Sequence, residues 1–279
     1  MATELKSIAG PAWPLGVRLP LVLTFEHQSG EGTPPKPGDR PNALMGGQIE
    51  YGARRGIWNV LEVLDRLGVK GTFFVSGLTA EKYPDTVRVA HAAGHEIAGM
   101  SYSFERIRTA SPERERAMVR KTAKVLADVC GATIKGWRCP DYRISPQTLD
   151  ILSTEGFAWD SSILNDDLPY TMDCEGGRMI EIPFSTSTAD KSFIAFPYPM
   201  RGGPDGLANV WDCEFEVLYR EAAAAPRFMI ISMQTWAIGK PTPLRTLRQF
   251  LERVMAHNDV QFARCAEIAA WSAAPVTRN

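Results

Sequence analysis

The chain is poor in the residues that build metal centres and disulfide frameworks. Its 279 residues include only four histidines, His27, His91, His95 and His257, and five cysteines without a CxxC pair. An odd, scattered set of cysteines does not suit a disulfide framework and fits a reducing compartment. A zinc enzyme with a histidine-rich site would need most of these few histidines in one place.

Two further absences narrow the class of protein. Lys and Arg number 31 and Asp and Glu 32, and a net charge of −1 creates no field that would attract nucleic acid or an anionic membrane. No apolar run reaches the roughly 18 residues of a membrane-spanning helix, and the N-terminal segment lacks the basic and apolar regions of a secretory signal. We therefore expect a cytoplasmic protein that binds neither nucleic acid nor membranes.

Short apolar runs alternate with amphipathic stretches along the chain, whose hydrophobic content is 44%. The expected strands cover residues 19–25, 71–76, 95–98, 134–137, 158–161, 179–183, 227–233 and 260–263, and the expected helices cover 51–67, 80–93, 112–130, 145–155, part of 205–223, and 244–257. This alternation predicts a parallel barrel, with a doubly wound sheet as the alternative. The Gly- and Pro-rich residues 29–48 predict a long loop. No linker is visible, so we expect one domain over residues 1–279.

Residues that follow the expected strands are the first candidates for a site, because α/β proteins place active sites at the carboxyl ends of strands. Glu26 directly follows the first strand and faces the long loop. It is interpreted as a general base, with a structural ion pair to an arginine as the alternative. Arg138 and Asp160 end two adjacent units, which predicts a buried ion pair. That pair would either orient a catalytic group or hold the barrel together.

Several stretches, in their order along the chain, resemble the polysaccharide deacetylase (NodB-homology) superfamily. They are LVLTFE (21–26), residues 50–77, AEKYPD (80–85), and residues 93–107, 136–170 and 231–251. The resemblance spans about residues 13–272 and is strongest to the branch that includes metal-independent allantoinases and cyclic imide hydrolases. It implies an irregular, partly open (β/α) barrel of the polysaccharide deacetylase type.

The resemblance also implies that this site has been rebuilt. Metal-dependent members have Asp-x-Asp after the first strand, where this chain has Glu26 and Gln28, and two histidine ligands where it has Met100 and Phe104. Their late catalytic histidine corresponds to Gln234. An amide, a thioether and a phenyl ring are poor ligands for zinc and similar metals. We therefore predict no catalytic metal and no other cofactor, while the acid position (Glu26), Arg138, Tyr142 and Asp160 are retained.

A site without a metal suits a carbonyl that is already activated, as in an imide, a ureide or a strained lactam, since Lewis-acid polarisation is missing. The predicted catalytic residues are Glu26, His27, Arg138 and Asp160. His27 is expected either to act as a second acid or base, because its ordinary pKa lies near neutrality, or to bind substrate. The predicted substrate-binding residues are Gln28, Met100, Tyr102, Phe104, Cys139, Tyr142, Gln234 and Trp236. Backbone N–H groups near Asp141 and Tyr142 are the expected oxyanion hole. Such a pocket suits a small, planar or hydrophobic molecule.

Two other functions stay open at this point. An altered homologue could act as a lyase or isomerase through Glu26 and His27. A protein without activity could bind a small molecule on a deacetylase scaffold, and the loss of the late histidine favours this alternative. Relatives in the branch are commonly homo-oligomers, so we also expect a homo-oligomer.

Overall fold

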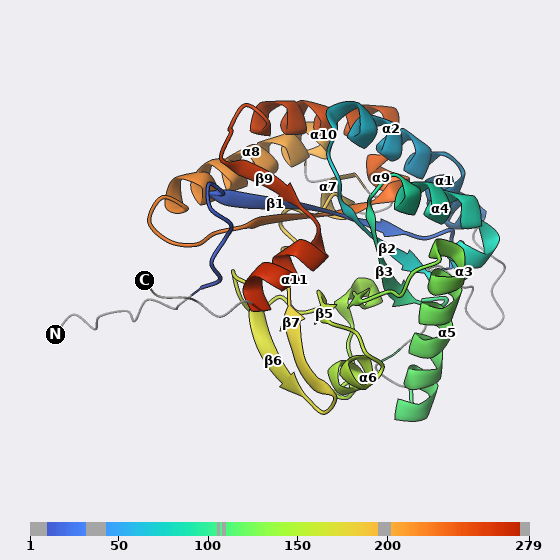
Figure 1. Cartoon of the computed structure of the whole chain (residues 1–279). Helices are drawn as coiled ribbons and strands as arrows, with labels where there is room; N and C mark the ends of the chain where they lie inside the picture. Colours follow the sequence, from blue (N-terminus) through green and yellow to red (C-terminus); the bar gives the residue numbers. More distant parts are fainter. Residues whose placement is uncertain (1–9, 32–42, 105–106, 108–109, 195–201, 274–279) are drawn as a thin grey trace.

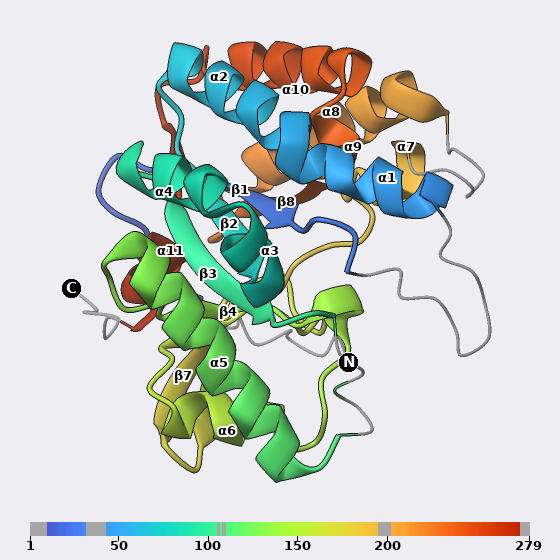
Figure 2. The same cartoon turned by 90° about the vertical axis from the view of Figure 1, so that its right-hand side faces the viewer.

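The computed structural model describes residues 10–31, 43–104, 107, 110–194 and 202–273. Within these residues, one nine-stranded sheet has the order β6-β7-β5-β4-β3-β2-β1-β8, and β9 pairs with the start of β1. All pairs are parallel except the β6–β7 hairpin. The sheet curls, and helices cover its outer face (Figures 1 and 2). The predicted irregular, partly open barrel is confirmed.

The strands are β1 Leu19–His27, β2 Thr72–Ser76, β3 Glu96–Ser101, β4 Gly136–Trp137, β5 Trp159–Asp160, β6 Tyr170–Cys174, β7 Gly177–Glu181, β8 Met229–Gln234 and β9 Val260–Ala263. Only β9 has the predicted bounds. The other differences matter at the carboxyl ends, because Glu26, His27, Met100 and Gln234 lie within strands instead of after them. The prediction missed β6, an edge strand whose residues are exposed or half-buried and lack a continuous apolar run.

The helical segments are α1 Ala43–Tyr51, η1 Gly52–Gly56, α2 Ile57–Leu67, α3 Gly77–Lys82, α4 Pro84–Ala92, α5 Pro112–Cys130, η3 Pro140–Tyr142, α6 Thr148–Thr154, α7 Lys191–Ile194, α8 Gly203–Glu221, α9 Thr235–Ile238, α10 Pro241–Val254 and α11 Cys265–Ala273. Among these described helices, none combines the length and apolar composition needed to cross a bilayer.

Local signals explain which helix predictions were right. Helix α5 has the predicted bounds, because the Ser111 side chain accepts a hydrogen bond from the Arg114 N–H and Gly131 ends the helix with a φ of 67°. The predicted helix 80–93 is two helices, since Tyr83 breaks it before Pro84.

Three other expectations were wrong in part: one helix start, one loop and one missing helix. Helix α6 starts at Thr148 and not at Ser145. The predicted loop 29–48 contains the start of α1, and its residues 32–42 lie outside the described part. No helix was predicted for residues 265–273, where α11 lies.

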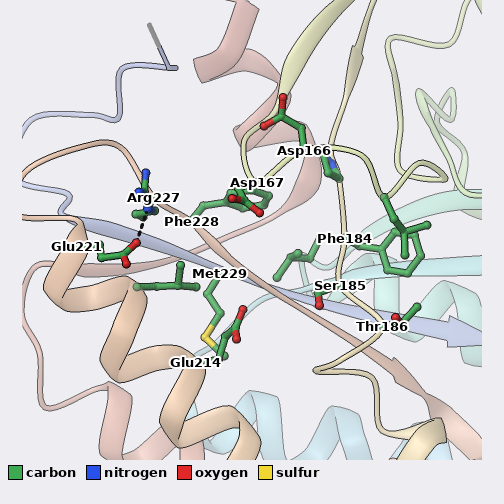
Figure 3. A pocket seen from close by; sticks show the side chains of 14 residues that line it. Asp166, Asp167, Phe184, Ser185, Thr186, Glu214, Glu221, Arg227, Phe228 and Met229 are labelled. Carbon is green, nitrogen blue, oxygen red and sulfur yellow. Dashed lines mark hydrogen bonds and ion pairs between the residues drawn. The ribbon is translucent and has the colours of Figure 1, made fainter. Parts of the chain in front are cut away.

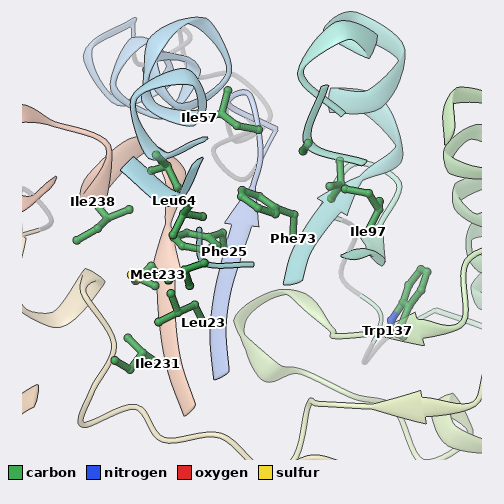
Figure 4. Packing of buried hydrophobic residues seen from close by; sticks show 14 of the residues in the cluster. Leu23, Phe25, Ile57, Leu64, Phe73, Ile97, Trp137, Ile231, Met233 and Ile238 are labelled. Carbon is green, nitrogen blue, oxygen red and sulfur yellow. The ribbon is translucent and has the colours of Figure 1, made fainter. Parts of the chain in front are cut away.

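Alternation along β1 separates two apolar layers. Leu21, Leu23 and Phe25 point outward and pack with the covering helices (Figure 4). Val22 points inward and packs with Phe74 and other residues inside the curled sheet. Because side chains alternate from one face of a strand to the other, Glu26 points inward like Val22, and His27 points outward like Phe25. This division determines which polar residues meet at the site.

Candidate active site

Glu26 is a buried carboxylate at the carboxyl end of β1, on the inner face of the sheet. Its side chain is 3% exposed, and one oxygen, Oε2, accepts a hydrogen bond from Gln234 Nε2. The other oxygen, Oε1, is buried and has no hydrogen-bond partner among the described residues. Burial raises the pKa of Glu26, against an opposing effect of the Arg138 charge and the Gln234 hydrogen bond. The carboxylate therefore has one oxygen in a hydrogen bond and one oxygen available to accept another.

Gln234 lies opposite Glu26 in the β1–β8 register. Its amide orientation follows from Trp236, whose indole N–H can only donate and lies 3.2 Å from Gln234 Oε1. Gln28 Nε2 donates to the same oxygen at 2.9 Å. The amide nitrogen of Gln234 must then face Glu26. Gln28 Oε1 is a second buried acceptor without a partner within the described part of the chain. Glu26 and Gln28, both hydrogen-bonded to Gln234, therefore each have one oxygen available to a substrate.

Close backbone packing fixes the position of Trp236. Helix α9, which carries it, lies against η1, and an added Cβ at Gly56 would come within 2.1 Å of the Thr235 carbonyl oxygen. An added Cβ at Gly52 would come within 3.0 Å of the Trp236 backbone nitrogen. Glycine at both positions therefore lets α9 approach η1 closely, which holds the indole against Gln234.

Arg138 is fully buried on the inner face, directly after β4. Its Nε donates to the Ser161 carbonyl at 2.9 Å and its Nη2 to Ser161 Oγ at 2.8 Å. Its Nη1 donates to Thr24 Oγ1 at 3.0 Å and Ser232 Oγ at 3.2 Å. Thr24 precedes Glu26 on the same face of β1, so the guanidinium lies one layer deeper than the carboxylate. Its positive charge opposes the effect of burial on the pKa of Glu26.

The predicted ion pair between Arg138 and Asp160 does not form. Trp137 and Asp160 are register partners in β4 and β5, and Trp137 packs in the outer layer. Asp160 therefore shares the outer face, while the next residue of the β4 segment, Arg138, points inward. Asp160 accepts hydrogen bonds from the Ser162 N–H and Oγ at 2.8 and 2.9 Å and faces Glu181, its partner in β7. The prediction had ignored this alternation of faces.

His27 also lies on the outer face, opposite to Glu26. Its Nδ1 lies 3.1 Å from Thr235 Oγ1 and its Nε2 lies 2.9 Å from Thr86 Oγ1. Burial lowers its pKa to about 4, so the ring is neutral at pH 7. Both ring nitrogens bind threonines between the sheet and the helices. The structure does not bring His27 and Glu26 together.

Three of the predicted substrate-binding residues belong to the apolar cluster on the inner face of the curled sheet. Met100 is fully buried there, and Phe104 and Tyr142 pack against the same cluster. The Tyr142 ring lies 3.8 Å from the Phe184 ring, and its hydroxyl lies 3.5 Å from Ser232 Oγ, which also binds Arg138. Gln28, Gln234 and Trp236 meet at Glu26 as described above. Six of the eight predicted substrate-binding residues therefore lie on the inner side or at its carboxyl end.

Tyr102 and Cys139 lie elsewhere. The Tyr102 hydroxyl donates to Glu81 at 2.7 Å, and Lys121 lies 3.4 Å over its ring, so Tyr102 belongs to the surface near α3 and α5. The Cys139 side chain packs in the outer apolar layer. Neither side chain faces Glu26.

The turn after Arg138 is strained. Asp141 and Tyr142 have φ angles of 49° and 58°, and Phe104 has a φ of 61°, in the region that glycine favours. Such strain concentrates at functional sites. The Tyr142 N–H, one of the expected oxyanion donors, already donates to the Cys139 carbonyl at 3.0 Å. The oxyanion hole predicted from this N–H therefore has no support in the geometry.

Sequence reasoning missed Asp190 and Lys191. Asp190 is fully buried, and its two carboxylate oxygens accept hydrogen bonds from the Gln234 N–H at 3.1 and 3.0 Å. Its own N–H donates to the Ser232 carbonyl at 3.2 Å. The next residue, Lys191, places Nζ 3.1 Å from Asp141 Oδ1. The polar stretch 185–192 belongs to none of the expected strands or helices, and Asp190 and Lys191 come well after the end of β7, so nothing in the local pattern marked these residues.

The donor set does not fit a divalent metal. The positions at which the resembling family places metal ligands hold the amide of Gln28, the thioether of Met100 and the ring of Phe104, which leaves Glu26 as the one carboxylate of the set. The described residues contain no group of three His, Cys, Asp or Glu side chains placed to hold a metal. We therefore derive no chemical step through a metal.

A separate cavity of about 360 Å³ opens on the side of the barrel between β7 and β8 (Figure 3). Phe184, Phe228 and Met229 line it, together with carboxylates of the 164–167 segment and of α8. None of the predicted site residues lines this cavity. Phe184, which lines this cavity, packs on the Tyr142 ring, and Phe228 belongs to the same inner apolar cluster.

This curled barrel, with polar residues gathered at the carboxyl end of β1 and β8, is similar to known polysaccharide deacetylases. A profile of the polysaccharide deacetylase family matches residues 46–158. A Schizosaccharomyces pombe protein named as a polysaccharide deacetylase is 26% identical over 243 residues, which cover 81% of this chain and 75% of that protein.

Solved structures agree with this assignment. A Mycobacterium smegmatis protein named as a polysaccharide deacetylase superposes with a TM-score of 0.86 at 28% identity, over 96% of this chain and 95% of that one. The PuuE allantoinase superposes with a TM-score of 0.85 at 27% identity, over 95% and 94%. The predicted resemblance to the NodB-homology superfamily is confirmed by these comparisons.

Proposed function

We propose that the chain is a metal-independent hydrolase of C–N bonds in small cyclic or otherwise activated amides, of the imide, ureide or lactam type. Glu26 is the general base. The observation that carries the proposal is the state of its carboxylate, with Oε2 held by Gln234 and Oε1 buried without a described partner. A base needs this combination of a fixed orientation and one free acceptor.

The pKa of Glu26 supports the same role. Burial raises it from the ordinary value for glutamate, which makes the carboxylate a stronger base than a solvated one. Arg138 and the Gln234 hydrogen bond lower it again, so the group stays able to lose its proton. A general base is most effective when its pKa lies near the working pH. In this proposal, Glu26 Oε1 takes the proton of the attacking water and later returns it to the departing nitrogen.

The neighbouring residues favour a substrate with a polar edge and a flat apolar body. Gln28 Oε1, an open acceptor, suits an N–H of an imide or ureide. Met100, Phe104 and Tyr142 supply apolar surface on the inner side. One of the superposed structures is the PuuE allantoinase. We include in the proposal a small-molecule substrate, action as a homo-oligomer and location in the cytoplasm.

The two other functions have less support. A lyase or isomerase through Glu26 and His27 would need both groups on one side of β1, but they point to opposite faces. A binder without activity is favoured by Gln234, which holds the base but cannot donate a proton as an acid. Turnover separates the second alternative from the proposal.

The test is a panel of hydantoins, cyclic imides, linear ureides and N-acetylglucosamine oligomers, assayed with and without a chelator. We expect turnover of at least one activated amide, unchanged by the chelator, and none of the oligomers. Activity that a chelator abolishes and zinc restores contradicts the proposal. Tight binding of panel members without turnover supports the binder instead.

A further inference from the structure

A metal-free amide hydrolase must stabilise the negative charge that develops on the carbonyl oxygen. Preorganised donors or cations near that oxygen account for a large share of the rate, and the loss of one donor typically costs about 10²–10³-fold. Two cations lie close to the base in the structure. Arg138 binds Thr24, two residues before Glu26 on β1. Lys191 follows Asp190, whose carboxylate accepts from the N–H of Gln234, the partner of Glu26. Their surroundings decide which of them can reach a substrate.

Arg138 is already committed to the protein. Its guanidinium makes four hydrogen bonds, to Ser161, Thr24 and Ser232, and lies 4.1 Å over the Phe74 ring. It is fully buried and one layer below Glu26. Moving it to a substrate would leave several buried groups without partners, which is costly. Arg138 therefore tunes Glu26 from below and stays in place.

Lys191 is placed differently. The residue before it, Asp190, is anchored to the end of β8 through the Gln234 N–H and the Ser232 carbonyl. Lys191 itself reaches Asp141 Oδ1 at 3.1 Å, and both side chains are almost half exposed. Asp141 lies in the strained turn next to Tyr142, whose hydroxyl approaches Ser232. The ion pair thus joins the two segments that flank the carboxyl end of β8.

We propose that Lys191 leaves Asp141 when substrate binds and donates to the carbonyl oxygen that becomes the oxyanion. This inference rests on the proposed hydrolase function. Exposed ion pairs are weak and screened by salt, so exchanging Asp141 for a developing oxyanion costs little. A hydrogen bond between an ammonium and an oxyanion is charge-assisted and strengthens as the charge develops. Asp141 holds the lysine at the site in the absence of substrate.

The step balances with water as the sole co-reactant. Water forms the C–O bond while its proton passes to Glu26 Oε1, and the π-electron pair of the carbonyl moves onto the oxygen beside Lys191 Nζ. The pair then re-forms the C=O bond as the C–N bond breaks, and Glu26 returns the proton to the nitrogen. In sum, one C–N bond and one water give one carboxylic acid and one N–H group, which belongs to an amine after a lactam, to an amide after an imide and to a urea after a ureide. In a cyclic substrate both groups stay on the same opened molecule.

The test uses binding as well as turnover. Calorimetry compares N-carbamoylglycine, which carries the carboxylate of a hydrolysed ureide, with neutral hydantoin. We expect Lys191→Met to lower the affinity for N-carbamoylglycine at least 10-fold and the affinity for hydantoin less than 2-fold. We expect Lys191→Arg to restore most of the lost affinity for N-carbamoylglycine. Asp141→Asn removes the competing carboxylate and is expected to raise the affinity for N-carbamoylglycine. The matched control is Lys124→Met, which removes another exposed lysine paired with an aspartate, Asp128.

Turnover supplies the second readout. On any panel member that is hydrolysed, Lys191→Met lowers kcat by about 10²–10³-fold with KM within 2-fold. The inference is overturned if wild type binds N-carbamoylglycine no more tightly than Lys191→Met, or if kcat does not fall. Absence of wild-type turnover on the whole panel contradicts the proposed function instead, while the difference in carboxylate binding still tests Lys191.

Discussion

Two buried carboxylate sites lie on opposite faces of the same sheet, and they differ in what surrounds them. On the outer face, Asp160 and Glu181 face each other, and burial raises the pKa of both. On the inner face, burial raises the pKa of Glu26 as well. A raised pKa therefore does not distinguish a base from a structural acid in this protein.

The partners across the strands do distinguish them. Asp160 accepts from Ser162, Glu181 accepts from the Ile163 N–H at 2.9 Å, and the register places the two carboxyl groups opposite each other. Glu181 Oε2 is also buried without a partner among the described groups, so an open oxygen alone does not identify a base. Glu26 keeps one buried oxygen without a partner among the described groups and has the Arg138 charge below it. Glu26 lies opposite the Gln234 amide, which donates to it, whereas Glu181 lies opposite a second carboxyl group. This difference favours Glu26 as the base.

The largest expected effect on stability is on the inner face, at Arg138. Arg138→Met removes a buried charge and leaves Thr24, Ser161 and Ser232 without their donor. We expect the free energy of unfolding to fall by about 3–5 kcal/mol, as when one member of a buried charged network is removed. Urea unfolding measures it. A loss below about 1 kcal/mol would show that the guanidinium does not hold the inner layer.

Trp236→Phe tests how the inner carboxylate is held. Without the indole N–H, the Gln234 amide can rotate, and its hydrogen bond to Glu26, which lowers the pKa of that group, weakens. We expect kcat/KM to fall about 3–10-fold, the value of one hydrogen bond, and the acid limb of the pH–rate profile to move to higher pH. Trp58→Phe, in α2, is the control. If the acid limb stays at the same pH, Trp236 contributes packing alone and does not orient Gln234.

His27→Gln separates the two faces directly. His27 faces outward, so kcat should stay within about 2-fold, whereas a catalytic acid or base would cost about 10²–10⁴-fold. Because its folded pKa is about 4 and its unfolded value is 6.5, wild type loses stability as pH falls below about 6.5. We expect the loss between pH 7 and pH 5 to be smaller in the variant by about 2 kcal/mol, as measured by urea unfolding.

The smallest effect is expected on the outer face, at Glu181. Glutamine resembles the protonated carboxyl group, so Glu181→Gln should change stability at pH 7 by less than about 1 kcal/mol and leave kcat unchanged. The folded pKa of Glu181 is raised, so wild type loses stability as pH rises above the ordinary glutamate value, and the variant loses less. Thermal unfolding from pH 5 to pH 9 measures this difference. A drop in kcat would show that Asp160 and Glu181 contribute to catalysis.

The sequence carried enough information for the fold and for Glu26. Apolar runs, glycines and caps predicted the alternation of strands and helices, and β9 and α5 have the expected bounds. The faces were harder to assign. In β1 every residue is buried, so hydrophobicity does not show which side is the interior, although period-2 alternation alone separates Glu26 from His27.

Long-range contacts explain the remaining errors. Lys191 meets Asp141 across 50 residues, and Asp190 meets the end of β8 across 44. Neither contact has a local pattern, because residues 185–192 lie in no expected strand or helix and their partners are distant in the sequence. The Arg138–Asp160 pair was predicted from proximity along the strand ends, but the β4–β5 register sends the two side chains to opposite faces.

The central claim is that the inner carboxylate, without a metal, carries the chemistry. Its most direct test is the kcat/KM of wild type and Glu26→Gln on an activated amide, both after chelator treatment, with thermal unfolding of each. The account predicts a loss of about 10²–10⁴-fold in the variant, with a melting temperature equal to or above that of wild type because a buried charge is removed. Equal turnover in the two proteins would contradict it.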